Sequence, residues 1–275
     1  MKIKKLLLVA AMTLAASLAG AQSLEFGLWA GGPGFSIGPT VNLKLPSGAW
    51  TFDAWLRAYL PNTDEISFGL GVKRSFEAGP AGRGEVGVKG FIGMDAHYWV
   101  EGFGDLVLGK TALSLQIGNT YNRTPSHFWP LQGETLGTYG RLAGKYRIDR
   151  QITLQGLVYA HEGGGQAEAA LVWRKGAQTF TLGAGGVDRA SNAYAILGYK
   201  TPYEKAVVAA ELRLGYVNEL NLSYADRLYK AHLLLAYPAR ARAGVAWENW
   251  ALDAEVDDAG YEFYLRYTMP LEGLQ

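Results

Sequence analysis

Charged side chains recur at every second position near the end of the chain, and they are the residues best placed to do chemistry. The basic ones are Arg240 and Arg242, and the acidic ones are Asp253, Glu255 and Asp257. Residues spaced by two share one face of a β-strand. A two-residue turn at 248–249 would set Arg242 opposite Glu255 and Arg240 opposite Asp257. Ion-pair ladders are therefore expected here, in preference to acid–base catalysis by paired carboxylates.

A second basic stripe comprises Arg141, Lys145 and Arg147, which again fall on one face of a predicted strand. On the wall of a channel, opposed charges orient polar solutes and rings of charge set ion preference. The alternative is that these charges only neutralise one another and keep the wall rigid.

The sequence offers little else for catalysis. It contains no cysteine, and its four histidines have no metal-ligand spacing such as H-x-x-x-H, so neither a metal nor a cofactor is predicted. His127 and His161 are the candidates for a base in a lipid-cleaving barrel enzyme. Glycine runs such as 163–165 precede no helix signal, which favours hairpin turns over phosphate-binding loops.

The alternation of apolar and polar residues seen near the end of the chain recurs along its whole length. Turn-separated segments from Leu24 to Met269 place apolar side chains on one face and polar or charged ones on the other. The exception is 192–200, which is apolar on both faces, so its orientation is left open. Residues 217–228 fit either a short strand or the extension of a longer one. Because bacterial single-chain barrels have an even number of strands, we predict about 16, with 14 to 18 allowed.

The N-terminus has the features of a secretory signal. Three lysines precede an apolar run that ends in Ala19-Gly20-Ala21. Cleavage there gives a signal peptide at 1–21 and one domain at 22–275. The mature chain then carries 23 basic and 25 acidic residues, a net charge of −2, which argues against binding nucleic acid.

Three features favour a barrel in a membrane. The apolar face carries aromatic residues near strand ends, the other face carries the charges, and closure of the sheet would remove its edges. Arg74 interrupts the apolar face, but close to a strand end, where its side chain can reach the interface. A soluble periplasmic β-sandwich remains the alternative, because alternation alone does not say which face meets water.

Two sequences resemble the bacterial outer-membrane β-barrels of the porin-like class: Ala19-Gly20-Ala21 and the alternating terminal strand 260–267. The chain departs from that class in ending with six further residues after Met269, where the class ends at an aromatic. The resemblance implies an antiparallel up-and-down barrel in the outer membrane. Its partners would be outer-membrane lipids, the barrel-assembly machinery, and small hydrophilic solutes or ions that diffuse through. An envelope-lipid enzyme and a structural or adhesive barrel are the alternatives, and the oligomeric state is left open.

The longest interruption of the pattern is 122–137, which contains Phe128 and Trp129. It follows the seventh predicted strand, so it lies on the outside if the mature chain begins in the periplasm. Folded inward, these two aromatic residues would constrict the channel.

Overall fold

The computed structural model describes residues 23–31, 36–57, 67–93, 98–121, 137–237, 240–257 and 260–270. No helix in these ranges is long and apolar enough to cross a membrane. The regular elements of these ranges are β-strands: β1 (Ser23–Gly31), β2 (Ser36–Ser47), β3 (Trp50–Arg57), β4 (Ser67–Glu77), β5 (Gly82–Gly93), β6 (Tyr98–Leu108), β7 (Thr111–Tyr121), β8 (Gly137–Arg147), β9 (Ile152–His161), β10 (Gly164–Lys175), β11 (Gln178–Val187), β12 (Arg189–Tyr203), β13 (Ala206–Gly215), β14 (Asn218–Ala225), β15 (Tyr229–Tyr237), β16 (Arg240–Trp247), β17 (Trp250–Asp257) and β18 (Gly260–Pro270).

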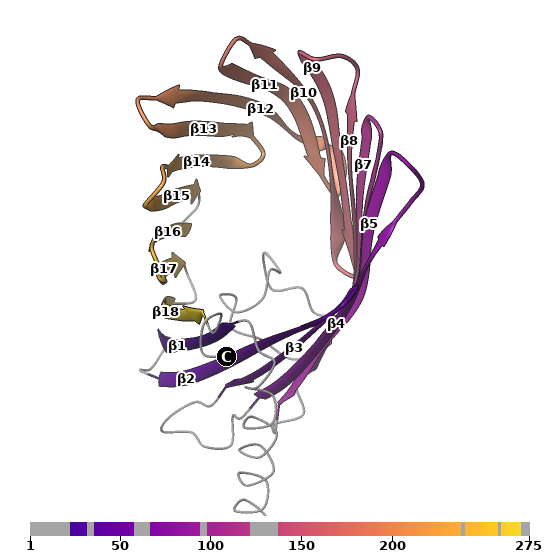
Figure 1. The fold of residues 1–275 in the computed structure, drawn as a ribbon. Coiled ribbons are helices and arrows are strands. Elements are labelled where there is room, and N and C mark those ends of the chain that lie inside the picture. Colours follow the sequence, from indigo (N-terminus) through magenta and orange to yellow (C-terminus); the bar gives the residue numbers. More distant parts are fainter. Residues whose placement is uncertain are drawn as a thin grey trace, which may run out of the picture.

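The strands form one antiparallel up-and-down barrel (Figure 1). Each strand pairs with the next one in sequence, and β1 pairs with β18 as well as with β2. The ring of hydrogen-bonded strands is therefore complete, and each described strand has a partner on both sides. The predicted all-β, up-and-down barrel is confirmed.

The strand count is 18, the top of the predicted range and two above its centre. The difference comes from the shortest strands. β14 has eight residues, as do β3, β16 and β17. Residues 218–225 are thus a separate strand, the first of the two alternatives that the sequence left open.

The two ends of the barrel differ in their connections. At one end, here called the turn end, consecutive strands are joined by two to four residues. At the opposite end, the loop end, connections include 58–66 and 122–136. Turn-end pairs such as Gly48-Ala49 and Gly176-Ala177 begin in the left-handed region, with φ of 61° and 62°. That conformation suits tight hairpins and favours glycine.

Alternate residues face inward and outward, and their exposure separates the two faces. On β7, Leu113, Leu115 and Ile117 are exposed, whereas the intervening Ser114 and Gln116 are less so. The same division on β9 and β10 places the apolar face outside and the polar face inside, as predicted. On β12, whose orientation the sequence did not determine, Tyr194 and Ile196 face inward and are buried.

Aromatic side chains gather at both rims of the outward face. Trp50, Trp173, Trp247 and Trp250 stand near the turn end, while Tyr98, Tyr237 and Tyr261 stand near the loop end. At the turn end the rings contact one another across strands, as in the pair Trp250 and Tyr267, whose centroids are 4.7 Å apart. The predicted aromatic residues at strand ends are therefore present at both rims.

Candidate functional site

The inward face carries the candidate site, and its most buried part lies on β5, β6 and β8. Tyr139 donates its hydroxyl to Oε2 of Glu101 at 2.7 Å and accepts a hydrogen bond from Nε1 of Trp99 at 2.8 Å. Lys89 pairs with Oε1 of Glu101 at 3.0 Å, and its ammonium group also lies over the rings of Trp99 and Phe103. Glu101 is only 1% exposed, so this carboxylate is held by a cation and a phenol inside the wall.

The pairing register explains how Tyr139 reaches Glu101 from two strands away. Glu101, Gly118 and Tyr139 lie directly opposite one another on β6, β7 and β8. The phenol ring lies across Gly118, where a Cβ atom would come within 2.4 Å of it. Glycine in the middle strand therefore lets the ring lie flat against the wall.

The same arrangement recurs on β10, β11 and β12, where Glu168, Gly185 and Tyr194 lie opposite one another. Tyr194 donates to Oε1 of Glu168 at 2.6 Å across Gly185. These two sets are called the acid–glycine–tyrosine rows. They fix two carboxylates at separate places on the inner wall.

Arg213 on β13 joins the second row to its neighbours. Its guanidinium group lies 3.3 Å from Glu168, 3.0 Å from Glu211 and 2.5 Å from Glu219. Three carboxylates therefore surround one cation, and this part of the wall carries an excess of negative charge.

The ladder predicted between the last strands is present in a different form. Arg242 lies opposite Glu255 and Trp247 opposite Trp250, which confirms the predicted register. The ion pairs are diagonal, however. Arg240 binds Oε1 of Glu255 through Nη2 at 2.6 Å, and Arg266 lies 3.4 Å from Asp253. A long guanidinium side chain reaches a diagonal neighbour as readily as a direct one, and no described acid pairs with Arg242.

The basic stripe of Arg141, Lys145 and Arg147 lies on the inward face of β8 and is exposed. Its one recorded polar side-chain contact is from Arg141 to Oε1 of Gln116, at 3.4 Å. No acidic residue occurs in β7, β8 or β9. This sector of the wall is therefore positively charged and lacks the neutralising partners that the other charged sectors have.

The acidic run Asp253, Glu255 and Asp257 lies on β17. In the ring of 18 strands, β17 is nine strands away from β8 in either direction. The two strands therefore lie on opposite sides of the barrel (Figure 1). The structure thus brings the two groups predicted from the sequence to opposite sides of the barrel.

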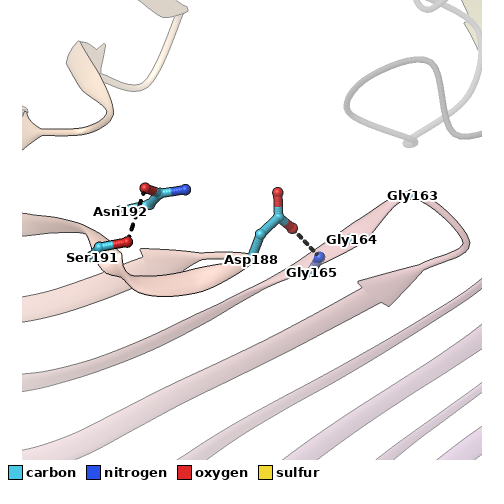
Figure 2. A pocket seen from close by; sticks show the side chains of 6 residues that line it. All are labelled: Gly163, Gly164, Gly165, Asp188, Ser191 and Asn192. Carbon is cyan, nitrogen blue, oxygen red and sulfur yellow. Dashed lines mark hydrogen bonds between the residues drawn. The ribbon is translucent and has the colours of Figure 1, made fainter.

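A shallow polar recess of about 550 Å³ lies at the loop end. Figure 2 shows the glycine run 163–165 on one side and Asp188, Ser191 and Asn192 on the other. Asp188 accepts the Gly165 amide hydrogen at 2.6 Å, which ties two neighbouring hairpins together. Gly163 lies in the hairpin turn that was predicted for this run, and Gly164 and Gly165 begin β10.

His161, one of the two candidate bases, precedes that turn. Its Nδ1 accepts the Gly163 amide hydrogen at 3.1 Å, and its ring lies 5.4 Å from that of Tyr159. Within the described ranges no serine hydroxyl contacts it, and no three His, Asp or Glu side chains are grouped to hold a metal ion. His127, Phe128 and Trp129 lie outside the described residues, as does the predicted signal at 1–21.

The buried residues Trp99, Glu101 and Tyr139 were not singled out from the sequence. Each lies on a face that alternation identifies as polar, but only the register between three strands brings them together. An inward-facing aromatic residue next to an acid was the one signal available.

Among known proteins, the chain is similar to solved structures only. No protein-family model matches the chain, and no curated protein does. Pseudomonas aeruginosa OccK10 (OpdN) is similar with a TM-score of 0.49 and 9% identity, over 91% of this chain and 99% of that one. Pseudomonas aeruginosa OccK9 (OpdG) gives 0.48 and 10%, over 90% and 97%. A triple mutant of the Rhodopseudomonas blastica porin gives 0.47 and 11%, over 90% and 98%.

Proposed function

We propose that this protein is an outer-membrane channel through which small hydrophilic solutes or ions diffuse. The observation that carries the proposal is the division of the closed barrel into an apolar outer face and a charged inner face. A lipid-facing surface tolerates few charges, since Lys or Arg at mid-depth costs roughly 2 to 4 kcal/mol, whereas a water-filled interior accommodates many.

The strand number supports an open path. Barrels of 16 to 18 strands are wide enough to leave an aqueous channel. Across that path, the basic stripe on β8 faces β17, where arginines pair with Asp253 and Glu255, so the stripe is the main source of a field across the channel. Polar solutes with separated charges would be oriented by it as they pass.

Conductance in planar bilayers tests the proposal. Purified protein should produce stepwise ion currents, and a folded sample without conductance would favour a structural or adhesive barrel instead. In a salt gradient, Arg141→Gln with Lys145→Gln should shift the reversal potential toward cation preference. The matched control is Arg74→Gln with Lys175→Gln, which removes the same charge from the outward face and should leave the reversal potential unchanged.

The location is part of the proposal. Export through the signal peptide at 1–21 and insertion of 22–275 by the barrel-assembly machinery would place the chain in the bacterial outer membrane. Outer-membrane fractionation and heat-modifiable gel migration test this. Recovery in the soluble periplasmic fraction would support the soluble alternative.

In this proposal the connection 122–136 constricts the channel. Phe128 and Trp129, folded inward, would narrow the path. Deletion of 124–134 should then raise the conductance, and an unchanged conductance would remove the constriction from the proposal.

A further inference from the structure

Two basic residues of the outward face each lie over a tryptophan ring. The guanidinium carbon of Arg74 is 5.4 Å from the centroid of Trp50, and Nζ of Lys175 is 5.9 Å from that of Trp173. Both contacts are cation–π interactions, in which the ring face attracts the positive charge. We call these the two cation–tryptophan pairs.

Both pairs occupy the same level of the barrel. Trp50 begins β3 and lies directly opposite Arg74 of β4, whereas Lys175 ends β10 next to Trp173. Both positions adjoin the short connections of the turn end. All four side chains are exposed, so the pairs form part of the outer surface.

The surroundings leave both cations without a carboxylate. Arg74 lies between Trp50 and Val86 in the sheet, and Lys175 lies opposite Gln178. No described acid pairs with either cation. Lys73, by contrast, faces inward from the adjacent position and pairs with Glu85 at 2.9 Å. The positive charge of the two pairs is thus directed out of the barrel, at the rim of its apolar surface.

We propose that the two cation–tryptophan pairs bind the phosphate groups of phospholipids at the turn end. The inference rests on the proposed membrane location. A tryptophan ring at this level sits among glycerol and headgroup atoms, while the cation above it reaches the phosphate. The exposed outward tryptophans lie at the turn end, so the two cations stand at the level of the membrane interface, where they can reach an anionic phosphate group.

Native mass spectrometry of the full chain in detergent tests the proposal, with dioleoyl phosphatidylglycerol as the probe. The wild type should retain up to two tightly bound lipids, and Arg74→Gln with Lys175→Gln should reduce retention at least tenfold. Dioleoylglycerol, which lacks the phosphate, should not be retained by either protein. Trp50→Leu with Trp173→Leu should weaken retention to a smaller extent, because the cations remain.

The matched control is Arg150→Gln with Lys205→Gln, which removes the same charge from turn-end connections without a tryptophan contact. It should retain lipid like the wild type. Equal loss in both double variants would show nonspecific attraction and overturn the proposal, as would unchanged retention in Arg74→Gln with Lys175→Gln. Heat-modifiable migration checks that each variant is folded. Stepwise conductance of the same samples, tested separately, distinguishes failure of lipid binding from failure of the proposed channel.

Discussion

Tyr139 crosses the backbone of an intervening strand to donate its hydroxyl to Glu101 at 2.7 Å. The bond joins β8 to β6, which share no ladder of their own, and Trp99 adds a second bond to the same hydroxyl. Side chains therefore couple β6 to β8 across β7, which main-chain hydrogen bonds join to both.

Tyr139→Phe should destabilise the barrel by about 1 to 3 kcal/mol, because it removes the hydroxyl that donates to the buried Glu101 and accepts from the indole N–H of Trp99. The measurement is the urea midpoint of refolded protein, followed by tryptophan fluorescence. Tyr146→Phe is the control, since Tyr146 is exposed on the outward face of the same strand. Equal midpoints for the two variants would contradict a structural role for the hydroxyl.

Gly118→Ala should displace the same phenol, because the new Cβ would lie 2.4 Å from Cζ of Tyr139. We expect a loss of about 1 to 3 kcal/mol, typical of overpacked sites. Gly140→Ala is the matched control, since the nearest atom to its Cβ would be 3.9 Å away. In a Tyr139→Ala background the effect of Gly118→Ala should disappear, and an undiminished effect there would show that the clash lies elsewhere.

Arg240→Gln and Arg242→Gln should differ, although the two arginines are two positions apart on one strand. Arg240 pairs with Glu255, a carboxylate 5% exposed, whereas no described acid pairs with Arg242. We expect about 2 kcal/mol of destabilisation for Arg240→Gln, less than for a fully buried pair because Arg240 is partly exposed. Arg242→Gln should change stability little. Similar urea midpoints would rule out the diagonal pairing as a source of stability.

Asp149 should make stability depend on pH in acid. The backbone N–H groups of Gln151 and Ile152 both donate to its Oδ1 at 2.7 Å and lower the pKa of this turn carboxyl below its ordinary value of 3.8. Because the folded-state pKa is the lower one, the stabilisation is fully present above pH 3.8 and is lost as pH falls through the folded-state pKa.

The measurement is the melting temperature of Asp149→Ala and of the wild type between about pH 2 and about pH 7. This range extends to both sides of the ordinary pKa of an aspartate. The variant should melt at a lower temperature near neutral pH, and the two curves should converge in acid. A difference that stayed constant throughout would mean that the carboxylate charge does not contribute.

Except on β12, the faces of the strands were predictable because alternation needs only the local sequence. The turn after Trp247 was equally local, so its register and the opposition of Arg242 and Glu255 were predicted correctly. The charge groups on β8 and β17 were identified too, since each lies within a single strand or hairpin.

The strand count and the contacts of the inner wall depend on more than one hairpin. The eight residues of β14 look too short to stand alone until β13 and β15 pair with both of its sides. The acid–glycine–tyrosine rows require the registers of two ladders at once, which alternation does not set. The same is true of the diagonal reach of Arg240, which depends on side-chain length and sheet twist.

The pairing of β1 with β18 also bears on how the barrel forms. Seventeen of the eighteen ladders join strands consecutive in sequence, and only this one brings together residues as distant as Ser23 and Pro270. Local hairpins close short loops and form rapidly, whereas contacts between distant segments are slow because their loop-closure entropy is large. The β1–β18 seam should therefore form last, so that completion of the ring, not the growth of the hairpins, sets the rate of folding.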